Sequence, residues 1–175
     1  MSVGRRRVFR GLLAGRGRVV GVMGGVLALA ALGVAAPAVA QPPAAETINI
    51  SWVVTSATTA PPFRLTATGT FAASGAMSDS GTGALAGQAV ADPSPIVGIF
   101  QYRSITLTGQ AGTLTLRCNS RSTDFSDPTA VPGSGPCAIT GGTGAYEDVH
   151  GQGTMSTVSN LVALTEVDAI SLNVV

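Results

Sequence analysis

Apolar and polar residues alternate with a period of two along most of the chain after residue 46. In the first such segment, Ile48, Ile50, Trp52 and Val54 alternate with polar residues, the pattern of a strand with one buried face. Further extended runs are expected at 63–71, 97–109, 112–118, 137–140, 153–158 and 168–174. Apart from a possible turn at 145–149, no segment carries a helical stripe. The pattern predicts an all-β domain.

Seven or eight short strands separated by Gly- and Pro-rich segments predict an antiparallel architecture. An eight-stranded barrel is favoured because closure removes exposed strand edges, and a β-sandwich is the alternative. Residues 81–95 contain Gly, Asp and Pro, and we expect a loop or an irregular edge there. The apolar parity changes within 97–109, which predicts a bulge near Arg103.

The N-terminal segment has the parts of a secretory signal peptide. Six arginines lie within residues 5–18, an uncharged Gly/Ala/Val/Leu stretch covers 19–36, and small residues precede a cleavage site between Ala40 and Gln41. The sequence therefore predicts a signal peptide at 1–40 and a single exported domain at 41–175. After cleavage we expect a secreted or envelope-exterior protein that is not held in a membrane.

The export route stays open. Arg6 and Arg7, followed by Val8 and Phe9, resemble the twin-arginine signal, although Arg10 stands where that pattern prefers leucine. The general secretory route is the alternative. An uncleaved anchor is a third possibility because about twenty apolar residues can span a bilayer; the many glycines, Pro37 and the cleavage site argue against it.

Composition excludes several chemistries. Without the leader, the chain keeps four arginines against nine acidic residues, a net charge of −5, so no basic patch for nucleic acid is expected. The chain contains no lysine, which excludes a Walker lysine and Schiff-base or pyridoxal chemistry. Two cysteines and one histidine offer no zinc-type spacing. We expect no cofactor and no metal.

Cys118 and Cys137 are the two cysteines of the chain. Because an exported protein meets oxidising conditions, they predict a structural disulfide. A redox-active pair is the alternative, but the chain has no Cys-x-x-Cys motif.

The most distinctive stretch runs from Ile139 to Thr154 and reads ITGGTGAYEDVHGQGT. Its glycines indicate a tightly shaped connection between strands, and without a third glycine and a βαβ unit it is not a dinucleotide fingerprint. The stretch resembles the GGTGxYxxxxGxGT signature of allene oxide cyclase-like and dirigent-like barrels. Residues 69–81 resemble a strand and turn of exported bacterial members. The resemblance implies an eight-stranded barrel, often oligomeric, with a central cavity, and it carries over no catalytic residue.

Four residues are candidates for acid–base chemistry. His150 is the one histidine of the chain, the residue type most used for acid–base chemistry, and it has acidic neighbours; a solvent-facing turn histidine between glycines is the alternative and the more common case. Tyr102 is the second candidate. Glu166 and Asp168 share the parity of the apolar residues around them, so in an unbroken strand they point into the barrel; alternatively, they mark the start of a strand.

The aromatic residues are candidates for lining a ligand cavity, and the same residues can fill a packed core. These candidates are Trp52, Phe63, Phe71, Phe100 and Tyr102. Asp124 and Asp127 are considered for calcium, but two acids without a loop signature are more typical of a solvated loop.

The sequence leads to a functional expectation and an alternative. We expect a non-catalytic exported protein that binds a small apolar ligand or has an envelope-associated role, with homo-oligomerisation possible. The alternative, which the resemblance suggests, is a cofactor-free isomerase or cyclase.

Overall fold

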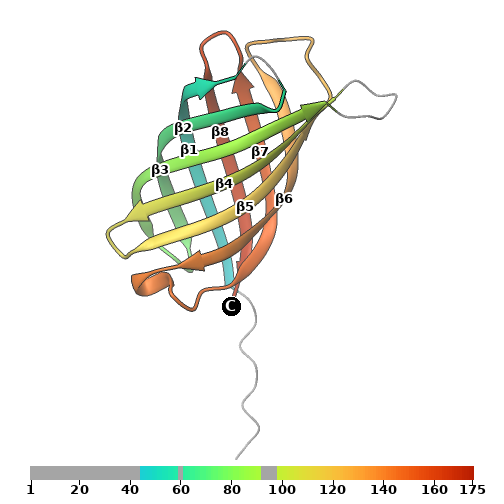
Figure 1. Cartoon of the computed structure of the whole chain (residues 1–175). Coiled ribbons are helices and arrows are strands. Elements are labelled where there is room, and N and C mark those ends of the chain that lie inside the picture. Colours follow the sequence, from blue (N-terminus) through green and yellow to red (C-terminus); the bar gives the residue numbers. More distant parts are fainter. Residues whose placement is uncertain (1–43, 59–60, 92–97) are drawn as a thin grey trace, which may run out of the picture. The chain divides into compact units, whose positions relative to one another are not determined.

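A computed structural model describes residues 44–58, 61–91 and 98–175 of the chain. The predicted leader and its cleavage site lie outside these residues. The described part contains eight strands and a short 3-10 helix (Figure 1). The elements are β1 (Ala44–Ala57), β2 (Phe63–Gly75), β3 (Asp79–Ala91), β4 (Ile99–Gly109), β5 (Thr113–Ser122), β6 (Val131–Gly142), η1 (Gly144–Tyr146), β7 (Gly151–Asn160) and β8 (Thr165–Val174).

The strands form a closed antiparallel barrel in which each strand pairs with its neighbours in sequence. Closure is made by β1, which pairs with β2 on one side and with β8 on the other. The predicted barrel is therefore confirmed and the sandwich is not adopted. Closure leaves no strand edge unpaired, which satisfies the backbone groups of every strand.

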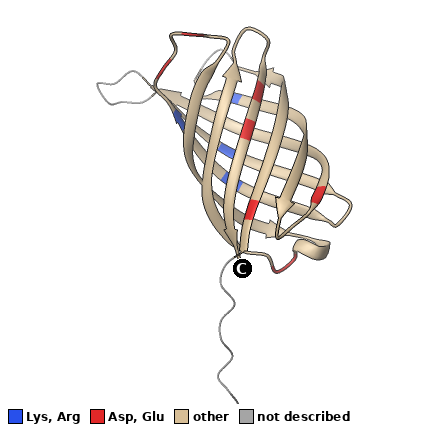
Figure 2. Ribbon diagram, turned by 180° about the vertical axis from the view of Figure 1, so that it is seen from behind, with Lys and Arg blue, Asp and Glu red and all other residues tan. Residues whose placement is uncertain are grey.

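The period-two alternation separates the interior of the barrel from its outer wall. Along β1 the buried residues are Glu46, Ile48, Ile50 and Trp52, and each residue between them is exposed. The outer wall is rich in Thr, Ser and Ala, and charged residues occupy few strand positions (Figure 2). The polar–apolar sorting of each strand thus fixes which face is buried.

Two local expectations are wrong. Residues 79–91 form the regular strand β3 rather than a loop, because the small residues of this segment alternate inward and outward like those of its neighbours. β4 has no bulge at Arg103, since its register with β3 and β5 is continuous through that residue. The parity changes because Phe100 and Tyr102 occupy outward positions while Arg103 points inward and is buried.

Cys118 on β5 and Cys137 on β6 are direct register partners and form a disulfide, with their Cα atoms 4.1 Å apart. Both side chains are buried. The predicted disulfide is confirmed, and it links two adjacent strands on the inside of the barrel.

The buried hydrophobic core receives side chains from all eight strands of the described barrel. The indole of Trp52 lies over Gly69 of β2 and Gly83 of β3, and a Cβ at Gly83 would lie 2.8 Å from its Cη2 atom. A side chain at residue 83 is therefore excluded by the ring. Trp52 occupies space that Gly83 leaves open two strands along the barrel wall.

The Tyr146 hydroxyl anchors the connection between β6 and β7. Tyr146 follows the glycines of the motif, is buried, and donates a hydrogen bond of 2.7 Å to the Asp79 carboxylate at the start of β3. Asp79 also accepts hydrogen bonds from the backbone N–H groups of Gln110 and Ala111. One carboxylate thus joins three connections at the lower end of the barrel.

Candidate functional site

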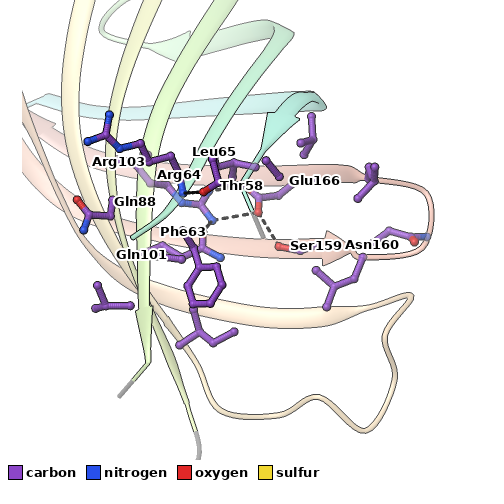
Figure 3. A pocket seen from close by; sticks show the side chains of 18 of the residues that line it. Thr58, Phe63, Arg64, Leu65, Gln88, Gln101, Arg103, Ser159, Asn160 and Glu166 are labelled. Carbon is purple, nitrogen blue, oxygen red and sulfur yellow. Dashed lines mark hydrogen bonds and ion pairs between the residues drawn. The ribbon is translucent and has the colours of Figure 1, made fainter. Parts of the chain in front are cut away.

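A cavity of about 400 Å³ opens at the end of the barrel where β1 and β3 finish and β2, β4 and β8 begin. It lies opposite the packed end that contains η1 (Figure 1). Aliphatic and aromatic side chains make up most of its wall (Figure 3). The apolar lining residues are Val54, Ala57, Phe63, Leu65, Ala89, Val90, Ala91, Ile99, Leu161 and Leu164.

A buried cluster of charged residues forms the floor of this cavity. Arg103 on β4 reaches across the barrel to Glu166 on β8, donating from Nη1 to Oε1 and from Nη2 to Oε2, the latter over 3.0 Å. Its Nη1 also lies 3.3 Å from both carboxylate oxygens of Asp168. Figure 3 shows dashed lines that join Arg103 to Glu166 and Glu166 to Ser159. Arg103 and Glu166 line the cavity, whereas Asp168 lies beneath them and is fully buried.

The two carboxyl groups of the cluster have opposite pKa shifts. Burial raises the pKa of Asp168 to about 6, and the nearby Glu166 carboxylate adds to the effect against the opposing guanidinium. Burial also acts to raise the pKa of Glu166, but Arg103 and the Ser159 hydroxyl outweigh it, so this pKa lies below its usual value. Near neutral pH, one guanidinium therefore faces two carboxylates, of which Asp168 is the easier to protonate.

Ser159 and Gln101 contact the cluster at the cavity floor, whereas Asn160 lines the cavity beside the β7–β8 turn. The Ser159 hydroxyl donates to Oε2 of Glu166 over 2.5 Å. The side-chain oxygen Oε1 of Gln101 accepts a hydrogen bond from Nη2 of Arg103. Asn160 accepts two hydrogen bonds from the backbone of the following turn. With their acceptor oxygens used in this way, the amide N–H groups of Gln101 and Asn160 are the donors that these side chains retain.

Three of the residues predicted from sequence lie at or beside this site. Glu166 lines the cavity, Asp168 lies directly beneath it, and Phe63 forms part of its wall at the mouth. Trp52 lies deeper and donates a hydrogen bond to Asp168. The interpretation of the two acids as inward-facing residues agrees with the structure, although β8 also begins only one residue before Glu166.

The other predicted residues lie elsewhere. Tyr102 is 52% exposed on the outer wall and borders an open hollow there, and Phe100 stacks under the Arg121 guanidinium. Phe71 is part of the packed core. His150 is exposed near the C-terminus, where its backbone pairs with Val175. Tyr102 and His150 are therefore not brought together with the cavity.

Arg103 is the functional residue that the sequence interpretation missed. The alternation pattern could have placed Arg103 inside the barrel, because Gln101 and Arg103 share the parity of the apolar residues Ile105 and Leu107. A charged residue at inward parity needs a buried partner of opposite charge, and the acids predicted to face inward on another strand supply it.

The turn between β7 and β8 places apolar residues at the mouth of the cavity. Leu161, Val162 and Leu164 are 52%, 71% and 52% exposed. Leu164 has a φ of 55°, a left-handed conformation that costs a non-glycine residue about 1–2 kcal/mol. Turns usually use Gly, Asn or Asp at such positions, so turn formation alone does not account for an exposed leucine here.

Asp124 and Asp127 each accept hydrogen bonds from a residue two positions further on, Ser126 and Thr129. These carboxylates shape their own loop between β5 and β6.

Within the described residues, no helix is long and apolar enough to cross a membrane.

Comparison with known proteins adds no family assignment. No model of a known protein family matches the chain, and a search of the curated proteins finds no significant match. The functional argument therefore depends on the cavity and its floor.

Proposed function

We propose that this protein is an exported β-barrel that binds a small apolar ligand without catalysing a reaction on it. The observation that carries the proposal is the cavity of about 400 Å³ with its mainly aliphatic wall. Binding sites for small molecules have volumes of this order, apolar walls and a few convergent polar groups. The disulfide is consistent with an exported location, and the proposed leader supplies the export signal.

The apolar turn at the mouth supports an envelope-associated role for the same protein. Exposed leucine and valine side chains cost free energy in water unless another apolar surface covers them. Leu161 and Leu164 belong both to this turn and to the cavity wall. An apolar ligand passing from a lipid surface would thus meet continuous apolar contacts from the rim to the floor.

Binding of an uncharged dye such as Nile red, which fluoresces in apolar surroundings, tests the proposal. We expect saturable binding by the wild-type protein and its loss in Ala89→Phe, because residue 89 lines the cavity. Ala84→Phe is the matched control, since Ala84 is exposed on the outer wall of the same strand. Equal dye binding by the two variants would place the dye outside the cavity and contradict the proposal.

A cofactor-free isomerase or cyclase is the alternative, and we propose it on the resemblance to allene oxide cyclase-like barrels together with one contact. Glu166 borders the apolar cavity and is held by Arg103 and Ser159, so its carboxylate is placed to accept a proton from a bound substrate as a general base. Rearrangement of an unsaturated fatty epoxide, measured with wild type and Glu166→Gln, tests this alternative. Equal product formation with the two proteins and without protein would exclude it.

A further inference from the structure

The polar floor of the cavity restricts the chemical class of the ligand. From its contacts we infer that the ligand is an uncharged amphipathic molecule whose single polar group is a hydroxyl seated beside Glu166 and Ser159, and that fatty carboxylates are rejected. This inference rests on the proposed binding function and goes further by naming the group that the floor recognises.

Both Nη atoms of the Arg103 guanidinium are already engaged, and within this group only the buried Nε has no hydrogen-bond partner among the described residues. Both of its Nη atoms donate to Glu166, Nη1 also contacts Asp168, and Nη2 donates to Gln101. Its side chain is 1% exposed. Arg103 therefore has no pair of unoccupied N–H groups with which it could bind a ligand carboxylate in the usual bidentate manner.

The charge of the floor also opposes an acid. Two buried carboxylates already face one guanidinium, and a carboxylate ligand would bring a third negative charge to it in a poorly solvated place. The other guanidinium of the lining belongs to Arg64, which is exposed at the mouth. Water and salt weaken any attraction at that position.

A hydroxyl matches the groups that remain available. Glu166 and the Ser159 oxygen keep lone pairs that accept a hydrogen bond, while the side-chain N–H groups of Gln101 remain as donors. A hydroxyl both donates and accepts, whereas a carboxylate only accepts. A hydrocarbon without a polar group would leave these atoms without water and without a partner.

Displacement of Nile red by decanol, decanoate and decane tests the inference on the wild-type protein at pH 7.5. Decanol should bind at least about tenfold more tightly than decanoate and more tightly than decane. Decanoate binding as tightly as decanol would overturn the inference while leaving the proposed function intact. Absence of binding by all three probes, and by the dye itself, would overturn both.

Three variants locate the cause of the discrimination. Asp168→Asn removes a negative charge without altering the cavity lining, and it should reduce the preference for decanol over decanoate at least about threefold. Arg64→Gln, at the mouth, should leave the preference unchanged. A preference that survives in Asp168→Asn would contradict the charge argument, and loss of decanoate binding in Arg64→Gln would show that acids bind at the mouth. Ala84→Phe again controls for altered surface binding.

Discussion

Trp52 donates its indole N–H to the carboxylate of Asp168 over 2.8 Å, and both side chains are buried inside the barrel. The two residues lie on the neighbouring strands β1 and β8. This bond satisfies the polar atom of the largest core side chain and links the packed half of the interior to the charged floor of the cavity. The position of the indole ring and the ionisation of the floor are thus connected through one hydrogen bond.

The indole ring also restricts which residue can occupy position 83 on β3. In Gly83→Ala the new Cβ would lie 2.8 Å from Cη2 of Trp52, so the ring or the strand must shift. We expect the free energy of unfolding to fall by about 1–3 kcal/mol, the usual cost of overpacking, measured by chemical denaturation. Ala84→Val, on the exposed face of the same strand, should change it by less than about 0.5 kcal/mol. Equal effects of the two substitutions would contradict the assigned packing.

Asp168 should make stability depend on pH. Its pKa is raised to about 6 in the folded state from 3.8, so the folded state binds a proton more readily than the unfolded chain. The contribution to stability is complete below about pH 4 and is lost as the pH rises through about 6. A shift of this size corresponds to about 3 kcal/mol.

Asp168→Asn isolates this effect. The amide cannot ionise, and its oxygen can still accept the hydrogen bond from Trp52. Relative to wild type, the variant should therefore gain stability as the pH rises from about 4 to 7, by up to about 3 kcal/mol. Denaturation curves at several pH values measure the difference between the two proteins. A difference that is constant across this range would contradict the raised pKa.

The disulfide between Cys118 and Cys137 should contribute substantially to stability. The bridge closes a loop with a sequence separation of 19 residues, for which the chain-entropy relation gives about 3 kcal/mol. We expect the double variant Cys118→Ala, Cys137→Ala to unfold at correspondingly lower denaturant concentration than the oxidised protein. Thiol titration of the oxidised wild type should find no reactive cysteine, and two free thiols would contradict the assignment.

The hydroxyl of Tyr146 should control the ionisation of Asp79. Its hydrogen bond is the main cause of the lowered pKa of that carboxyl group, while burial and the contact with Asp79 raise the pKa of Tyr146 to about 12. In Tyr146→Phe the Asp79 pKa should rise toward its usual value, as followed by NMR titration of the carboxyl carbon. An unchanged Asp79 pKa would mean that the backbone donors alone determine it.

Most of the barrel could be predicted from the sequence, because in an antiparallel strand with one buried face every second residue is apolar. β1 shows this directly, with its buried residues at every second position. The strand β3 was missed because Gly81, Gly83 and Gly87 are permissive residues that weaken a strand signal. Their role depends on what lies opposite them, such as Trp52, and such long-range packing is not visible in a local pattern.

The candidate site was predictable only in part. The inward parity of Glu166 and Asp168 is a local property, and it indicated their place correctly. Arg103 also has inward parity, but this was missed because the apolar residues Phe100 and Tyr102 occupy the outward positions beside it. The size of the cavity could not be predicted at all, because it depends on residues from six strands that meet at one end of the barrel.

The most direct test of this account is an NMR titration of the isotope-labelled protein with decanol at pH 7.5. We predict saturable shifts in the methyl signals of Val54, Ala89 and Leu164 and in the indole N–H signal of Trp52, because the first three line the cavity and the last reports on its floor. Shifts confined to the outer wall around Tyr102, or no saturable shifts, would contradict a ligand-binding cavity in this barrel.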